Sequence, residues 1–189
     1  MTLTTLTRLL IAGLAIPVHP TPPSAPDKAY VPAHIILIRH AEEPSNADNP
    51  HLSTKGEVRA EHLVEFMTHD PAMIRLGTPV AIYATETTHD GNGERTQETV
   101  APLAKVLNLD VRTPFHAKDF DKLATQVLSD HSLDGKTVVI CWNHEYIPQL
   151  AHALGATSAP SKWKDKVYDL VYVISYRGGK ATLTTTKYD

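Results

Sequence analysis

The sequence is poor in cysteine, with Cys141 as its single residue of this type among 189. One cysteine excludes an internal disulfide framework and any cysteine-rich zinc or iron–sulfur site. Positive charge is not in excess either, because 18 Lys and Arg stand against 21 Asp and Glu and the formal net charge is -3. Proteins that bind nucleic acid or anionic membranes usually carry a basic excess, so we expect neither partner here.

Long apolar runs are also lacking, and we expect no stable membrane span. One short apolar run, residues 9–18, follows the basic residue Arg8 and precedes a segment rich in Pro, Ser and Ala. This order is typical of a secretory signal peptide. We therefore predict that residues 1–26 are a signal peptide or a disordered tail and that residues 27–189 form a single domain. The protein would be secreted or periplasmic if the segment is cleaved, and cytoplasmic otherwise.

Histidine is abundant, with 11 residues, whereas the overall composition is that of an ordinary globular protein: 42% of residues are hydrophobic and 21% are charged. Histidine changes its charge near neutral pH, and it can act as an acid, a base, a nucleophile or a metal ligand. The composition alone does not say which of the eleven take part in chemistry.

Apolar patterns that indicate strands and helices alternate along the chain. Short runs rich in β-branched residues predict strands at residues 34–38, 79–85, 136–142, 168–175 and 181–186, with a short one at 109–111. Helical spacing of apolar residues predicts a helix that begins at Thr54, capped by the Thr54–Glu57 box, and helices that include 100–107, 120–128 and 147–154. Such alternation predicts a three-layer α/β/α fold with a mostly parallel sheet, whose last two strands form an antiparallel edge hairpin.

Basic side chains follow the predicted strands at the edge of the sheet where ligands bind in α/β proteins. Arg39 and His40 end the first strand, the loop after the second strand leads to Arg95, and His144 follows the strand at 136–142. The planar guanidinium of arginine suits phosphate oxygens, and a histidine held between arginines can attack phosphorus. The pattern indicates a phosphate site.

Four segments resemble, in order, the motifs of the histidine phosphatase superfamily, also called the phosphoglycerate-mutase-like family. They are I-I-L-I-R-H-A-E at 35–42, L-S-T-K-G-E-V-R-A-E-H-L at 52–63, R-T-Q-E-T-V-A-P-L-A at 95–104 and V-V-I-C-W-N-H-E at 138–145. The segment 163–173 is similar to the final strand of the smaller phosphatase-like members. In the first motif, Ala41 stands where the family has glycine.

The resemblance implies a role for four residues. His40 matches the nucleophile that becomes phosphohistidine, Arg39 and Arg95 match the arginines that bind phosphate oxygens, and His144 matches the second histidine of the pocket. A small metal-independent phosphatase without a cofactor is therefore expected. Its substrate would be a phosphorylated small molecule, with protein phosphohistidine as an alternative.

The general acid is less directly implied. Many members of the family use a carboxylate in an insert after the second arginine, but the corresponding region here, 113–121, is short. Asp119 and His116 are the candidates in it. Glu42, next to the nucleophile, and His89, in the loop at 86–94, are candidate substrate-binding residues.

Four other interpretations are weaker. A zinc protease needs a second histidine where H-E-Y-I-P has Pro148, and a nucleotide-binding P-loop needs a Gly-Lys-Ser/Thr sequence that the glycine-containing segment D-G-N-G-E-R-T at 90–96 lacks. A phosphate-binding module without turnover would share the same fold, and a phosphoglycerate-mutase-type phosphotransferase would need long inserts that are missing. The sequence indicates neither the exact substrate nor an oligomeric state.

Overall fold

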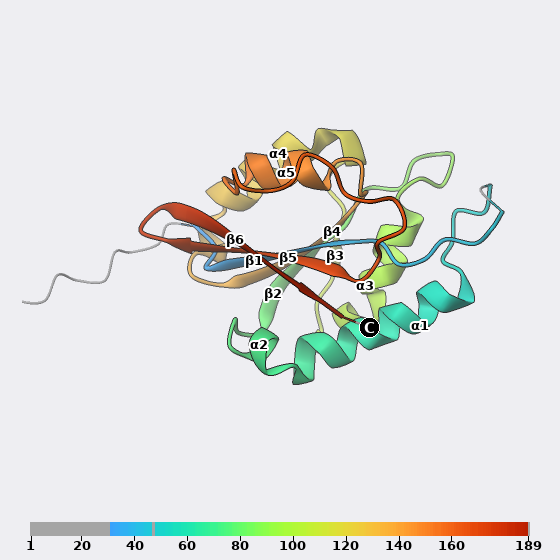
Figure 1. Ribbon diagram of the computed structural model, residues 1–189, viewed down its shortest axis with the longest axis horizontal. Helices are drawn as coiled ribbons and strands as arrows, with labels where there is room; N and C mark the ends of the chain where they lie inside the picture. Colours follow the sequence, from blue (N-terminus) through green and yellow to red (C-terminus); the bar gives the residue numbers. More distant parts are fainter. Residues whose placement is uncertain (1–30, 47, 189) are drawn as a thin grey trace, which may run out of the picture.

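A computed structural model describes residues 31–46 and 48–188 (Figure 1). The signal peptide or tail predicted at residues 1–26 lies outside the described residues. Within the described part of the chain, no helix is long and apolar enough to cross a membrane.

Six strands form one sheet in the order β3-β2-β4-β1-β5-β6. β1 pairs in parallel with β4, β4 with β2, and β2 with β3, whereas β5 and β6 join in antiparallel fashion on the other side of β1. The predicted parallel sheet with an antiparallel edge hairpin is confirmed. The strands are β1 (His34–Arg39), β2 (Pro79–Tyr83), β3 (Val111–Arg112), β4 (Thr137–Trp142), β5 (Leu170–Arg177) and β6 (Lys180–Lys187).

Helices cover both faces of this sheet. The α-helices are α1 (Thr54–His69), α2 (Pro71–Ile74), α3 (Glu94–Leu107), α4 (Phe120–Ser129) and α5 (Ile147–Ala153), with short 3-10 turns at Ala117–Asp119 and His131–Leu133. In Figure 1, α4 and α5 lie on one side of the sheet, and α1, α2 and α3 lie on the other. The molecule therefore has the three layers that the alternating pattern predicts.

The core lies on both sides of the central strands, which explains why β1 is apolar without interruption. Ile35 and Leu37 pack in the cluster that includes α4 and α5 residues, whereas Ile36 and Ile38 pack in the cluster that includes α1 and α3 residues. All four are fully buried. Successive side chains in a strand point to opposite faces, so a strand between two helical layers needs apolar residues at every position.

Several element boundaries differ from the predicted ones. The N-cap of α1 is Ser53, whose hydroxyl accepts a hydrogen bond from the Gly56 amide at 3.1 Å, so the expected Thr54 cap is wrong by one residue. The short α2, begun by Asp70 and Pro71, was not expected. The strand predicted from residue 168 begins at Leu170, which leaves Tyr168 in the loop before it.

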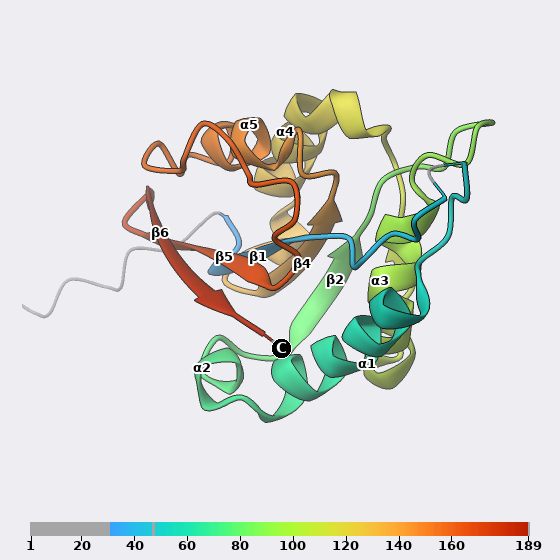
Figure 2. The ribbon, with the colours of Figure 1, turned by 45° about the vertical axis from the view of Figure 1, so that its right-hand side comes forward.

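The sheet order brings three chain segments together at one edge. β1, β4 and β2 are neighbours and run parallel, so their carboxyl ends lie side by side. Figure 2 shows the chain leaving β1 toward the N-terminal end of α3. The loops after these strands form the site described next.

Candidate active site

His40 follows β1 directly and is only 5% exposed. Its Nδ1 lies 2.7 Å from the carbonyl oxygen of Ala41. A carbonyl only accepts hydrogen bonds, so Nδ1 carries the proton and Nε2 keeps its lone pair. Burial lowers the pKa of His40 to about 4, and the positive charges of Arg39 and Arg95 contribute to the lowering. At neutral pH the ring is therefore uncharged and suited to nucleophilic attack.

Hydrogen bonds to two helices hold the backbone after His40. The Ala41 amide donates to the Thr99 hydroxyl at 2.8 Å, and that hydroxyl donates to the Arg95 carbonyl at 2.6 Å. The Ser53 amide donates to the Glu42 carbonyl at 2.9 Å. The backbone next to His40 is thus held by α3 on one side and by the start of α1 on the other.

Glu42 is buried against α1. Its two carboxylate oxygens accept hydrogen bonds of 2.8 Å from Arg59, and Lys55 lies 3.1 Å away. Burial alone would raise the pKa of Glu42, but the hydrogen bonds from Arg59 and Lys55 outweigh this effect and lower it. Arg59 engages both carboxylate oxygens. Glu42, which the sequence predicted to bind substrate, therefore holds the loop after β1 against α1.

Arg39, the last residue of β1, is 1% exposed. One of its terminal nitrogens donates to the Asp165 carbonyl, and the other lies 3.4 Å from the Tyr168 hydroxyl. The guanidinium carbon lies 4.1 Å from the centroid of the Tyr168 ring. Nε is buried without a hydrogen-bond partner. An unpaired buried donor of this kind is costly in a folded protein, and an anionic ligand is one group that could accept from it.

His144 lies beside His40. Its ring centroid is 6.4 Å from that of His40, and its Nε2 is 3.7 Å from a carboxylate oxygen of Asp165. Burial, followed by the charge of Arg39, lowers the pKa of His144. Its Nδ1 is buried without a partner. The two histidines and Arg39 thus form one group at the ends of β1 and β4.

Arg95 lies in the first turn of α3 and connects this helix to the loop after β1. Nε donates to the His51 carbonyl at 3.1 Å, Nη2 to the Asn49 carbonyl at 2.5 Å, and Nη1 to Glu43 at 3.2 Å. A guanidinium has five N–H groups, so donors remain for a ligand.

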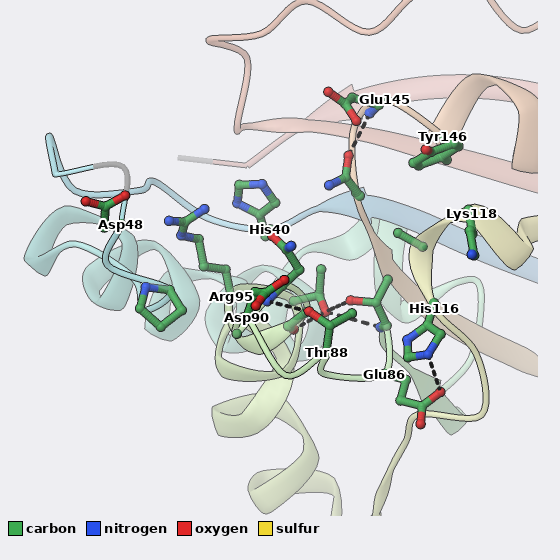
Figure 3. A pocket seen from close by; sticks show the side chains of 18 residues that line it. His40, Asp48, Glu86, Thr88, Asp90, Arg95, His116, Lys118, Glu145 and Tyr146 are labelled. Atoms are coloured by element: carbon green, nitrogen blue, oxygen red, sulfur yellow. Dashed lines mark hydrogen bonds and ion pairs between the residues drawn. The ribbon is translucent and has the colours of Figure 1, made fainter.

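A cavity of about 710 Å³ opens next to His40 and Arg95. Figure 3 shows the predicted acid candidate His116 on another wall, paired with Glu86. Its Nε2 lies 3.5 Å from the Glu86 carboxylate, and its Nδ1 is buried without a partner. Trp142 donates a 2.9 Å hydrogen bond to the Ala117 carbonyl and so fixes the loop that carries His116.

Five of the predicted site residues do not belong to the cavity lining: Arg39, Glu42, His89, Asp119 and His144. Asp119 pairs with Lys122 at 2.7 Å, and this hydrogen bond lowers its pKa. His89 is exposed, and its neighbours Asp90 and Gly91 line the cavity instead.

Four residues that contact the predicted site were not singled out from the sequence as site residues. They are Glu43, Glu86, Asp165 and Tyr168. Glu43 follows the first motif directly, and this adjacency was the one available signal. The others come from loops without a periodic pattern.

Metal ligands are not grouped in the described part of the chain: within residues 31–46 and 48–188, no three His, Cys, Asp or Glu side chains are placed to hold one ion. The positive charge around His40 comes from arginine.

Several solved structures with the same architecture are phosphatases, although no family model and no curated protein sequence matches this chain. Alpha-ribazole phosphatase from Shigella flexneri is 14% identical, with a TM-score of 0.57 over 82% of this chain and 96% of the other. Phosphoserine phosphatase from Entamoeba histolytica, solved as a histidine-to-alanine mutant with phosphoserine, is 15% identical, with a TM-score of 0.54 over 82% and 95%. The chain has the histidine phosphatase fold.

Another protein of this fold was solved with phosphate. The mycobacterial glucosyl-3-phosphoglycerate phosphatase, in complex with inorganic phosphate, is 13% identical, with a TM-score of 0.53 over 82% of this chain and 95% of the other. The histidine phosphatase fold that the sequence motifs imply is thereby confirmed.

Proposed function

We propose that this protein is a metal-independent phosphatase that hydrolyses a phosphomonoester through phosphohistidine at His40. The observation that carries the proposal is the state of His40: a buried, neutral imidazole with Nδ1 bound to a carbonyl and with Arg39, Arg95 and His144 around it. Phosphoryl transfer needs a positioned nucleophile and positive charge around the phosphate oxygens. This arrangement supplies both.

In the first step the Nε2 lone pair of His40 attacks phosphorus, and the bond from phosphorus to the leaving oxygen breaks. That oxygen takes a proton from His116 when it leaves as an alcohol. In the second step water attacks the phosphohistidine, its proton passes to His116, and the P–N bond returns its electron pair to Nε2 as inorganic phosphate leaves. Arg39, Arg95 and His144 hold the phosphoryl oxygens during both steps.

His116 is favoured over Asp119 as the acid because of where the two side chains lie. His116 lines the cavity beside His40, and Glu86 lies against its Nε2. Asp119 is paired with Lys122 and does not belong to the cavity lining. The size of the cavity suits a phosphorylated small molecule, and the neighbours named above include phosphatases for such molecules.

The test is turnover of p-nitrophenyl phosphate by the wild type and by His40→Ala, each with and without a chelator. We expect activity in the wild type that the chelator leaves unchanged, and a loss of at least about 10³-fold in His40→Ala. His62→Ala, a substitution on the exposed face of α1, is the matched control and should retain full activity. Full activity in His40→Ala, or loss of wild-type activity with the chelator, would overturn the mechanism. Phosphate binding without turnover would indicate a binding module.

A further inference from the structure

Glu43 lies between two parts of the phosphate site. One carboxylate oxygen is 3.2 Å from Nη1 of Arg95, and the other accepts a 3.4 Å hydrogen bond from the Tyr168 hydroxyl. Tyr168 in turn contacts Arg39, whose guanidinium lies against its ring. An anionic group thus connects the two arginines that are expected to hold phosphate.

The charge of Glu43 also acts on the groups around it. Its negative charge raises the pKa values of Arg39, His40 and His144, against the larger lowering effect of burial on each. The printed contacts of Glu43 with Arg95 and with Tyr168, the residue that covers Arg39, place its carboxylate at the same site. A phosphate dianion bound to the same arginines would occupy a neighbouring position, and two anions at that distance repel each other.

We propose that the Glu43 carboxylate competes with phosphate for Nη1 of Arg95, so that a phosphoryl group that binds there must displace Glu43 from Arg95 and from the Tyr168 hydroxyl. Glu43 is then a residue that sets the affinity and selectivity of the site: it weakens the binding of free phosphate, and it disfavours substrates with a second anionic group near the phosphate. The inference rests on the proposed function, because it assumes that Arg95 binds the phosphoryl group.

Displacement is feasible because the Glu43 side chain is 44% exposed. Ion pairs with an exposed partner contribute little to folding, since water screens them and compensates for their loss. By contrast, Glu42 is held by two 2.8 Å hydrogen bonds from Arg59 and is buried. Of the two adjacent carboxylates, Glu43 is therefore the one free to move without disturbing the loop.

The experiment measures binding of inorganic phosphate, by calorimetry and as inhibition of p-nitrophenyl phosphate turnover. It compares the wild type with Glu43→Gln and Tyr168→Phe. Glutamine keeps the size and removes the charge, and phenylalanine keeps the ring on Arg39 while it removes the hydroxyl that binds Glu43. Glu61→Gln makes the same charge change on the exposed side of α1 and serves as the control.

We expect Glu43→Gln to bind phosphate about three- to ten-fold more tightly, with a lower KM and a kcat within about two-fold of the wild type. Tyr168→Phe should shift phosphate affinity in the same direction, and Glu61→Gln should match the wild type. Equal or weaker phosphate binding by Glu43→Gln, or equal tightening in Glu61→Gln, would overturn the inference while leaving the proposed function intact. Absence of both phosphate binding and turnover in every variant would overturn both.

Discussion

At the scale of single residues, the chemistry depends on the proton of His40. The Ala41 carbonyl holds that proton on Nδ1, and burial opposes the charged form of the ring. In the proposed mechanism, His40 therefore attacks without first losing a proton to another base. In that mechanism, the positive charges of Arg39 and Arg95 attract the anionic phosphoryl group to His40.

The first prediction concerns the titration of His40. We expect its ring to titrate at about pH 4, because the buried site opposes the imidazolium. The measurement is the chemical shift of its ring protons by NMR across the acid range, with the resonance assigned by its absence in His40→Gln. A midpoint between about 6 and 7, the ordinary histidine range, would contradict the proposed environment.

The second prediction concerns His116 as general acid. His116→Ala should lose about 10²-fold in kcat for an alkyl phosphate, whose leaving oxygen needs a proton, and little for p-nitrophenyl phosphate, whose leaving group does not. The measurement is kcat for both substrates. Asp119→Asn is the matched comparison and should leave both rates near the wild type. An equal loss on both substrates in His116→Ala would point to a structural role.

The sequence indicated some residues of the site and missed others, because only some of them belong to a local motif. His40 and Arg39 belong to a motif within one strand end, so their neighbours in the chain identify them. Glu43 and Tyr168 acquire their roles from a contact across 125 positions, which no local pattern contains. Glu42 was predicted at the substrate because of its place after the motif, but Arg59 of α1 takes up both of its oxygens.

At the scale of elements, two helices hold the loop that carries the nucleophile. α3 supplies Thr99 and Arg95, one turn apart on the same face, and α1 approaches the loop at Gly56. A side chain at Gly56 would place its Cβ 2.3 Å from the Glu42 carbonyl oxygen, so the close approach needs a residue without one.

The third prediction tests the link through Thr99. Thr99→Val removes the acceptor of the buried Ala41 amide and should cost about 1–2 kcal/mol of stability, with about a ten-fold lower kcat because His40 loses its fixed position. Chemical unfolding and turnover measure the two effects. Thr125→Val removes a similar 2.9 Å bond to a helix carbonyl on α4 and should leave kcat unchanged. Wild-type kcat in Thr99→Val would show that the link does not position the nucleophile.

The fourth prediction tests the contact at Gly56. Gly56→Ala must push the Glu42 backbone away and should destabilise the protein by about 1–3 kcal/mol, with a loss of activity. Alanine normally favours a helix over glycine, so an uncrowded position would respond with a gain in stability. Glu61→Ala, on the exposed side of the same helix, provides the comparison. A more stable Gly56→Ala protein would show that the helix and loop can separate without cost.

The elements themselves were largely predictable, because their apolar spacing reflects two helical layers on one sheet. The boundaries of these helices and strands were less predictable. The cap of α1 moved to Ser53 because its hydroxyl, rather than that of Thr54, reaches the Gly56 amide. The helix predicted around residues 100–107 begins at Glu94 in the structure, which brings Arg95 and Thr99 onto its first turns. Polar residues there face the site, so they carry no apolar signal.

At the scale of the whole molecule, burial of ionisable groups makes stability depend on pH. Burial lowers the pKa values of His34, His40 and His144 in the folded protein. Below about pH 6.5 the unfolded chain therefore binds more protons than the folded one, and folding loses stability as the pH falls. The low pKa of Glu42 extends the loss further into the acid range, where its carboxylate becomes protonated and its pairing with Arg59 weakens.

The fifth prediction follows from this linkage. The urea concentration at half-unfolding should fall from about pH 7 to about pH 5 at constant ionic strength, and the fall should be smaller in His40→Gln, which lacks the largest of these contributions. Fluorescence or circular dichroism can follow the transition. Equal midpoints at the two pH values in the wild type would contradict the buried, neutral state of these histidines.

The order of elements, the three layers and the pair Arg39–His40 were determined by the sequence itself, because apolar periodicity and a contiguous motif are local properties of a chain. Tertiary structure decided which distant loops meet. The parallel pairing of β2, β4 and β1 brings Arg95, His144 and His40 to one edge of the sheet. The antiparallel pairing of β1 with β5 brings Glu43 against Tyr168, and the parallel pairing of β2 with β3 brings His116 against Glu86. Such contacts depend on the order of the strands and on the path of the loops. The role of a side chain depends on which distant residue it contacts, and a local sequence pattern does not contain that information.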